Sequence, residues 1–163
     1  MEVRLATPED AEVVANIRVI TYQTSYRGYL PDNFLDSLKI DENVTQMTEE
    51  YLKDGLMYLA TDKDKPVAYA HITDRGNDIF EIDALYCHPD YQRKDAGRLL
   101  VNTLCQMKRG QGFKHCTIST LKDGPSIAFY EKMGFKKLDV PNGKWEMCGW
   151  DFSYPTVKMQ KEL

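Results

Sequence analysis

The chain has 163 residues, of which 42% are hydrophobic and 28% are charged, and its formal net charge is −4. This composition fits one globular domain with a sizeable core and excludes a largely disordered chain. The acidic balance argues against a nucleic-acid partner, and no apolar run reaches membrane-spanning length. Four cysteines without a CxxC pair or zinc-like spacing, and a start without signal-peptide character, predict free thiols, no metal site and a cytoplasmic location.

The first third of the chain carries one strand signal and then helix signals. Residues 2–6 alternate like a short strand, and a Thr-Pro pair then begins a helix with apolar residues at helical spacing. The segment 25–32 ends this pattern. Asp32 and Asp41 can each cap a short helix, and the apolar residues of these two helices are Phe34, Leu35, Leu38, Val44, Met47 and Tyr51.

The middle of the chain favours strands. Residues 56–61 and 67–73 flank a polar turn and predict a hairpin, and residues 79–87 form a longer apolar strand that is typical of the centre of a sheet. A helix is predicted over 96–109, and the residues expected on its buried face are Leu99, Leu100, Leu104 and Met107.

The last third repeats the alternation of strand and helix. It predicts a strand over 114–120, a helix over 126–133, and one or two more strands around 135–150 and 154–160. A right-handed crossover would place strand 114–120 parallel to the strand before the long helix. No linker or repeat divides the chain, so we predict a single α+β domain over all 163 residues, with one mixed sheet and helices on both faces.

The stretch YQRKDAGRLL, residues 91–100, places charged and small residues where the long helix begins. A helix N-terminus offers unpaired backbone N–H groups and a partial positive charge, and small residues let a ligand approach the backbone. The stretch therefore suits a pyrophosphate, although a capped helix with solvated Arg and Lys explains the residues equally well. It matches neither GxxxxGK[ST] nor GxGxxG.

Five segments together resemble the GNAT acetyltransferase superfamily. QRKDAG at 92–97 resembles its Q/R-x-x-G-x-G/A acyl-CoA loop, and LYCHPDY at 85–91 is similar to the strand end before that loop. AFYEKMGF at 128–135 is similar to its FYEKxGF helix, and VKMQKEL at 157–163 resembles its closing strand. SYRGYLPD at 25–32 is similar to a segment common in one bacterial branch, so the resemblance covers almost the whole chain.

The resemblance implies a mostly antiparallel sheet whose central V-shaped splay holds acetyl-CoA. The residues that it implies for cofactor binding are Leu85, Tyr86, Cys87, Gln92, Arg93, Lys94, Asp95, Ala96, Gly97, Arg98, Asp123 and Tyr130. Two of them depart from the family pattern, since Asp95 replaces a Gly and Asp123 replaces an Asn. A carboxylate near a pyrophosphate is unfavourable, so Asp95 must point away or be offset by Arg93, Lys94 or Arg98.

Acetyl transfer needs a group that takes a proton from the ammonium, donors for the oxyanion, and a proton for the leaving sulfur. The resemblance places Tyr130 beside the thioester sulfur as general acid, whereas helical spacing alone favours a core aromatic next to Phe129. Glu81 and Asp83 share one face of a strand, so they either hold the ammonium and take its proton or lie on a solvated face. Several family members carry their base where Glu81 stands. His71 is a weaker candidate for relaying a proton.

In the resembled family the acceptor side is lined by the segment that here contains Tyr22, Tyr26, Arg27 and Tyr29. Ordinary packing and a solvated Arg explain these residues as well. Trp145 and Trp150 have two interpretations, closing of the acceptor cleft or a contact in the homodimer that the family often forms.

These observations predict an N-acetyltransferase that moves the acetyl group of acetyl-CoA directly to a primary amine. The two strand acids favour a cationic acceptor, such as a polyamine, an aminoglycoside or a peptide N-terminus, without choosing among them. A non-catalytic acyl-CoA sensor is the alternative, since Asp95 and Asp123 weaken the match to the cofactor site. A nucleotide-phosphate binder of another fold ranks third.

Overall fold

The computed structural model describes residues 1–46 and 51–163, and the strands of this part form one sheet. Their hydrogen-bonded order is β1-β2-β3-β4-β5-β8-β6, with β7 paired to β8. The strands are β1 Glu2–Leu5, β2 Met57–Asp62, β3 Lys65–Gly76, β4 Ile79–Cys87, β5 His115–Leu121, β6 Lys136–Lys137, β7 Gly143–Glu146 and β8 Ser153–Glu162. Antiparallel pairing joins β1 to β2, β2 to β3, and β8 to β5, β6 and β7. The predicted α+β class with a mostly antiparallel sheet is confirmed.

Every predicted helix is present in the described residues. The helices are η1 Pro8–Asp10, α1 Ala11–Ser25, α2 Asp32–Ser37, α3 Ile40–Gln46, η3 Leu52–Asp54, η4 Pro89–Tyr91, α4 Ala96–Gly110 and α5 Ile127–Lys132. Met47, which was expected on the third helix, lies outside the described residues. No helix in the described ranges has the length and apolar character needed to cross a membrane.

Some predicted details of the helices and of the tail are wrong. Asp32 does not cap α2, because Pro31 occupies the N-cap position and Asp32 is already the first helical residue. Asp41 does not cap α3 either, because α3 already begins at Ile40, and Tyr51 lies beyond the end of this helix at Gln46. The tail holds three strands instead of one or two, because non-strand residues separate β6 from β7 and β7 from β8. A Pro-Asn pair immediately before β7 contributes to the first of these breaks, since both residue types favour turns over strands.

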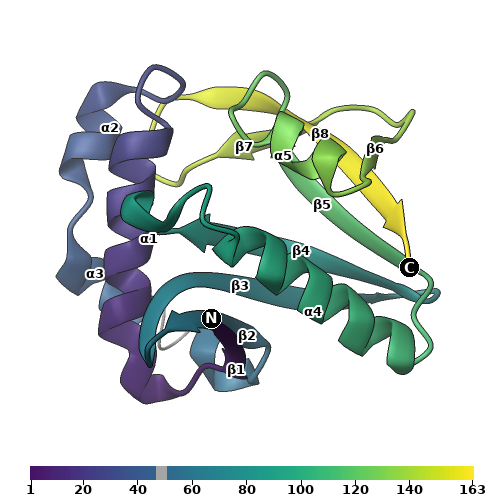
Figure 1. Ribbon diagram of the computed structural model, residues 1–163. Coiled ribbons are helices and arrows are strands. Elements are labelled where there is room, and N and C mark those ends of the chain that lie inside the picture. The colour runs from purple at the N-terminus through teal and green to yellow at the C-terminus, as the bar shows by residue number, and fades with distance from the viewer. Residues whose placement is uncertain (47–50) are drawn as a thin grey trace. The chain divides into compact units, whose positions relative to one another are not determined.

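The chain forms two compact units, and the first comprises residues 1–73 and 82–104. Its core brings Val14 and Ile17 of α1 against Leu59 of β2 and Tyr69 of β3. Figure 1 shows α1 in purple with α2 and α3 beside it, and both contact α1. The apolar face of α1 supplies the core, because the helical period places these side chains on one side.

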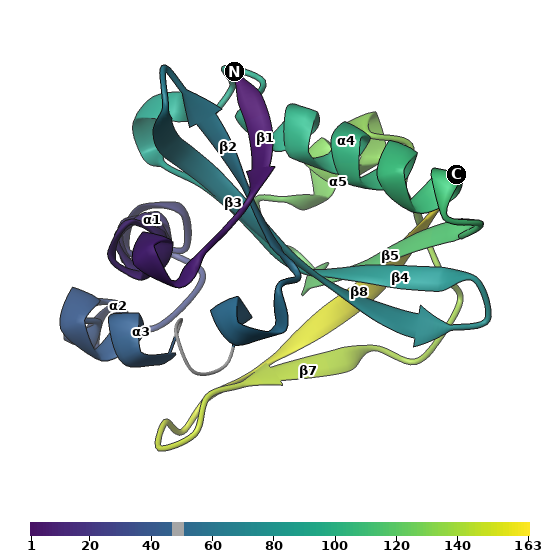
Figure 2. The same cartoon turned by 90° about the horizontal axis from the view of Figure 1, so that it is seen from below.

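The second unit comprises residues 74–81 and 105–163 and is built on β8. This strand pairs with β5 from His115 opposite Glu162 to Leu121 opposite Thr156. In Figure 2 the hairpin partner β7 lies beside the yellow β8. The fully buried side chains of this unit include Phe80, Ile118, Phe135 and Met159.

The buried face of α4 differs from the one predicted. The buried residues are Ala96, Leu100, Val101, Leu104, Cys105 and Lys108, whereas Leu99 and Met107 are only partly buried. Lys108 is tolerated there because its Nζ lies 2.6 Å from Asp74 Oδ1 and 4.6 Å from the centre of the Phe113 ring. The predicted buried face did not include Lys108, since a lysine normally marks the solvent face.

Candidate functional site

The turn between β4 and α4 adopts the backbone of an anion cradle. Arg93 and Asp95 have φ angles of 61° and 69°, so left-handed residues alternate along the turn. The N–H of Leu99 donates to the carbonyl of Asp95 over 2.8 Å at the start of α4. The N–H groups of 96–98 precede this bond, and the first N–H groups of a helix have no partner in its own ladder. Such an arrangement of N–H groups binds phosphate oxygens.

Asp95 takes the left-handed conformation that the family pattern assigns to glycine. Aspartate tolerates this conformation better than most side chains, so the turn keeps its shape without a Gly. The carboxylate lies 3.0 Å from the guanidinium of Arg98, and both side chains are largely exposed. Arg98 therefore offsets the negative charge, as the sequence required of one of the three neighbouring cations.

Side chains of α1 fasten the end of β4. The carbonyl of Cys87 accepts hydrogen bonds from the Thr21 hydroxyl over 3.1 Å and from Gln92 Nε2 over 3.2 Å. Gln92 Nε2 also donates to the Ser25 hydroxyl over 3.0 Å, so this predicted cofactor residue locks the turn to α1. Burial raises the pKa of the Cys87 thiol to about 11, which keeps it protonated at neutral pH and unsuited to act as a nucleophile.

A cluster of tyrosines joins α1 to β3 and β4. The hydroxyls of Tyr22 and Tyr86 lie 3.1 Å apart, and the Tyr22 ring lies 5.2 Å from the ring of Tyr26. Tyr86 also packs against Tyr69, with ring centres 5.4 Å apart. Burial raises the pKa of Tyr69 and of Tyr86 well above the usual range, so both phenols stay neutral. Tyr29 does not belong to this tyrosine cluster and is exposed.

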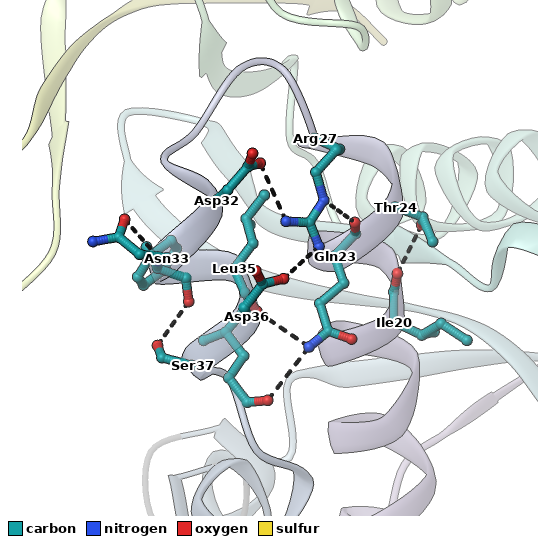
Figure 3. A network of polar contacts seen from close by, with 11 residues as sticks. Ile20, Gln23, Thr24, Arg27, Asp32, Asn33, Leu35, Asp36 and Ser37 are labelled. Carbon is teal, nitrogen blue, oxygen red and sulfur yellow. Dashed lines mark hydrogen bonds and ion pairs between the residues drawn. The ribbon is translucent and has the colours of Figure 1, made fainter.

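Arg27 connects the end of α1 to α2 (Figure 3). Its guanidinium lies 3.2 Å from Asp32 and 2.9 Å from Asp36, and its Nε donates to the Gln23 carbonyl. Gln23 Nε2 reaches on to the Leu35 carbonyl over 3.1 Å. The predicted acceptor-side residue Arg27 thus already binds two carboxylates, and it holds the segment 25–32 in place.

Asp83 belongs to a polar cluster of the first unit. Its Oδ2 lies 3.3 Å from His71 Nδ1, an ion-pair distance, and accepts a hydrogen bond from the Thr73 hydroxyl. His71 Nε2 lies 2.9 Å from Asp54 Oδ2, so carboxylates flank the imidazole on both sides. The Tyr51 ring packs edge-on against the imidazole with centres 5.0 Å apart. Burial opposes the imidazolium, but the contacts to Asp83 and Asp54 outweigh it and raise the pKa of His71.

Glu81 belongs to a different cluster, in the second unit. Arg75 Nε donates to Glu81 Oε2 over 2.8 Å, and Lys158 Nζ lies 3.6 Å from the same oxygen. The Ser119 hydroxyl donates to Oε1 over 3.3 Å. Two cations therefore compensate this carboxylate, whose side chain is only 11% exposed.

Tyr130 and Asp123 also lie in the second unit. Tyr130 is buried on α5, with its ring 5.2 Å from Phe129 and 5.5 Å from Phe135. Asp123 is exposed in the turn after β5, just before Gly124, whose N–H donates to the Leu121 carbonyl. Within the ranges that the structure describes, no group of His, Cys, Asp and Glu side chains could hold a metal ion.

The structure thus brings the turn 92–98, the end of β4, Asp83 and the tyrosine cluster together in one unit. Sequence reasoning missed Asp54 and gave His71 little weight. The hairpin register could have indicated the contact between Asp54 and His71. Met57 of β2 pairs with His71, and Asp54 and Gly55 lie just before β2 in the sequence. The cations around Glu81 gave no local signal, since Arg75 and Lys158 are far from each other in the sequence.

Comparison with known proteins agrees with this architecture. The model of the acetyltransferase (GNAT) family matches residues 19–135. The chain is 28% identical over 151 residues to the uncharacterized N-acetyltransferase YuaI of Bacillus subtilis, covering 90% of this chain and 86% of that protein. It is 28% identical over 143 residues to the uncharacterized N-acetyltransferase YjgM of Escherichia coli, covering 83% and 80%.

Solved structures share the fold. The PaiA N-acetyltransferase of Thermoplasma acidophilum, in complex with coenzyme A, has a TM-score of 0.80 at 19% identity, over 99% of this chain and 98% of that one. A GCN5-related N-acetyltransferase of Rhodopseudomonas palustris has a TM-score of 0.79 at 22% identity, over 99% and 95%. Since the family model spans most of the sequence, the chain belongs to the GNAT acetyltransferase family. It is accordingly an acyl-CoA-dependent N-acetyltransferase with acetyl-CoA as cosubstrate.

Proposed function

We propose that this protein transfers the acetyl group of acetyl-CoA to a cationic primary amine by direct attack in a ternary complex. The observation that carries the proposal is the turn 92–95, in which Arg93 and Asp95 are left-handed and which leads directly into the N-terminus of α4. A diphosphate bound there would extend the pantetheine arm along Leu85 and Tyr86. The Cys87 thiol stays protonated, which favours direct attack over a covalent acetyl-enzyme.

The reaction removes two protons from the acceptor nitrogen. An alkylamine arrives as an ammonium and must lose one proton before its lone pair can attack the thioester carbonyl. The C–N bond then forms, the C–S bond breaks, and the nitrogen loses a second proton on the way to the amide. The departing sulfur takes up one proton as it becomes a thiol, and the other must reach solvent.

Three side chains divide this work in our proposal. Asp83 and Glu81 supply the negative side of the acceptor site, and Asp83 takes the ammonium proton because its neighbours include an imidazole that can pass the proton on. The Tyr130 hydroxyl protonates the leaving sulfur, since a phenol carries its proton at neutral pH. The proposal requires this hydroxyl to reach the thioester sulfur.

The acceptor that fits best is a small molecule or peptide that presents an ammonium. Glu81 and Asp83 attract the charge, and the rings and hydroxyls of Tyr22, Tyr26 and Tyr86 offer a polar aromatic wall. Such a wall also binds the methylene groups of an alkylamine. We therefore expect diamines and longer polyamines to react faster than monoamines of the same chain length.

The test measures free thiol released from acetyl-CoA in the presence of a panel of primary amines. Tyr130→Phe is expected to lower kcat by about 10²- to 10⁴-fold, the usual range for a general acid. Its affinity for acetyl-CoA should remain within about twofold of wild type, because only the hydroxyl is removed.

Tyr58→Phe is the matched control, since Tyr58 is a half-buried tyrosine on β2, outside the proposed machinery. We expect it to leave both quantities unchanged. Full turnover by Tyr130→Phe would remove the general-acid role. Thiol release that no amine accelerates would overturn amine acetylation itself.

A further inference from the structure

His71 connects two carboxylates that come from separate elements of the first unit. Its Nδ1 lies 3.3 Å from Asp83 Oδ2 on β4, and its Nε2 lies 2.9 Å from Asp54 Oδ2 at the end of η3. An imidazole can accept a proton at one nitrogen while it releases another from the opposite nitrogen. The Nε2 contact is a hydrogen bond, whereas the buried Nδ1 has no hydrogen-bond partner among the described residues and lies at ion-pair distance from Asp83. The imidazole is therefore placed between the two acids with one nitrogen available to accept a proton.

Asp54 is held in place for this contact. Its Oδ1 accepts the N–H of Leu56 over 2.9 Å, which leaves Oδ2 directed at the imidazole. Gly55, between Asp54 and Leu56 in the sequence, has a φ of 69°. This left-handed residue forms the tight turn that brings the Leu56 N–H back to the Asp54 carboxylate. The Leu56 carbonyl in turn accepts the N–H of Ile72, the residue after His71.

The exposed fractions of the three side chains indicate the direction in which a proton would leave toward solvent. The His71 side chain is 7% exposed, so water reaches it poorly, whereas Asp83 is 23% and Asp54 is 35% exposed. The imidazole is thus the buried middle of a path with a more open carboxylate at each end. Asp54 is the more exposed end, where a proton passes easily to water.

We propose that His71 and Asp54 carry the acceptor's proton from Asp83 to solvent, an inference that depends on Asp83 being the base of the proposed acetyl transfer. Both are positioning residues, because they act through Asp83 and not on the amine. No oxidant or further reactant is needed, since the path moves only one proton.

The transfer proceeds in balanced steps. Asp83 takes a proton from the acceptor ammonium, which frees the nitrogen lone pair for attack. The proton passes to His71 Nδ1 as the Nε2 proton passes to Asp54 Oδ2, and Asp54 releases it to water. Asp83 is then a carboxylate again, while the second nitrogen proton restores the Tyr130 hydroxyl that has protonated the sulfur.

The charges around the imidazole are compatible with this role. From β4 it faces Asp83, from η3 it faces Asp54, and the Tyr51 ring covers one edge. The two carboxylates raise the pKa of His71, which makes the ring a better acceptor for a proton from Asp83. The relay step starts from the neutral ring that carries its proton on Nε2, since an imidazolium has no nitrogen free to accept another proton.

His71→Gln and Asp54→Asn test the path. Glutamine keeps an amide N–H near Asp54 and asparagine keeps an oxygen near His71, but neither carries a proton onward at neutral pH. We expect each variant to lose about 10- to 100-fold in kcat, below the loss expected for Asp83→Asn, with acetyl-CoA affinity unchanged. Small imidazole buffers should restore the rate of His71→Gln in proportion to their concentration, and should not accelerate wild type.

His115→Gln is the matched control, because His115 is also a strand histidine but its Nδ1 lies 3.3 Å from an amide, that of Gln160. We expect it to behave as wild type. A His71→Gln variant that is slow but insensitive to buffer would show a purely structural role and overturn the relay, even if its melting temperature is lower. Should His71→Gln not fold, the buffer response of Asp54→Asn decides in the same way.

The outcome also separates this inference from the proposed function. If Asp83→Asn is impaired while His71→Gln and Asp54→Asn turn over at the wild-type rate, the relay is wrong and the base assignment stands. If Asp83→Asn is itself fully active, the base assignment is wrong and the relay falls with it.

Discussion

Glu81 and Asp83 are two residues apart on β4, yet their surroundings differ in kind. Glu81 is bound by Arg75 and Lys158 and by a serine hydroxyl, so fixed positive charge surrounds it. Asp83 accepts a hydrogen bond from a threonine hydroxyl and lies 3.3 Å from His71, whose pKa the flanking carboxylates raise. We therefore propose different tasks for the two carboxylates: Glu81 adds negative charge to the acceptor site from within a fixed network, and Asp83 exchanges protons.

This difference shows why a pair of acids in a sequence is not yet a catalytic pair. The spacing predicts that both side chains share a face, which led us to expect them to act on the ammonium together. The neighbouring elements give the two acids different partners, because cations from β3 and β8 lie against Glu81 while an imidazole lies against Asp83. An ammonium that approaches Glu81 must compete with two cations that are already there.

Asp83→Asn is expected to have the largest effect. Removing a general base lowers the rate by about 10²- to 10⁴-fold, so kcat should fall in that range at pH 7 while acetyl-CoA binds as before. Thiol-release kinetics and a binding titration measure the two quantities. Asp78→Asn, at an exposed acid paired with Lys114, is the control. A larger loss in Glu81→Gln than in Asp83→Asn would reverse our assignment of the two roles.

Glu81→Gln should act mainly on stability. It leaves Arg75 and Lys158 without their shared carboxylate, and breaking such a partly buried network costs about 1–3 kcal/mol. Each kcal/mol lowers the melting temperature by roughly 2–4 °C for a chain of this size. The rate per folded molecule should fall by less than tenfold. Unchanged thermal unfolding would contradict the structural role.

His71→Gln should show a pH-dependent loss of stability of about 1 kcal/mol. The pKa of His71 is raised on folding from its ordinary value of 6.5, so protonation stabilises the fold. That stabilisation is complete below pH 6.5 and disappears as the pH rises through the folded pKa. The difference in unfolding free energy between wild type and variant should therefore be largest near pH 5.5–6 and shrink above neutrality, as denaturant titrations can measure. A difference that grows with pH would show that the imidazole is neutral in the folded protein.

Asp95→Gly should have the smallest effect. The Asp95 carboxylate is largely exposed and forms a surface ion pair with Arg98. Such a pair contributes about 0–1 kcal/mol to stability. Glycine relieves the left-handed strain and removes a negative charge from the turn, so we expect stability within about 1 kcal/mol of wild type and tighter binding of acetyl-CoA. Asp64→Gly is a control, since Asp64 is left-handed in the β2–β3 turn. Weaker cofactor binding in Asp95→Gly alone would show that the carboxylate organises the turn.

Much of the fold follows from local pattern. The alternation of β2 and β3, the long apolar β4 and the helical spacing of α1 and α4 were recognisable because these elements bury one continuous face, and burial imposes a period on the sequence. The family segments added the anion-binding turn, whose shape depends on the local residues 92–97. Local interactions also determine where a helix begins, although Asp32 shows that a good capping residue is overridden when a proline precedes it.

The partners of the polar side chains were decided by the tertiary structure. Nothing in the sequence joins Asp54 to His71, Gln92 to Ser25, or Lys108 to Asp74, because hydrogen bonds and ion pairs between distant residues leave no periodic trace. The sequence by itself determined that this chain forms a GNAT-like sheet and carries acids, a tyrosine and a turn of charged and small residues before α4. Only the tertiary structure decided which acid lies near cations from β3 and β8 and which lies near an imidazole. The reason is that electrostatic interactions depend on the distance between groups in space and not on their separation in the sequence.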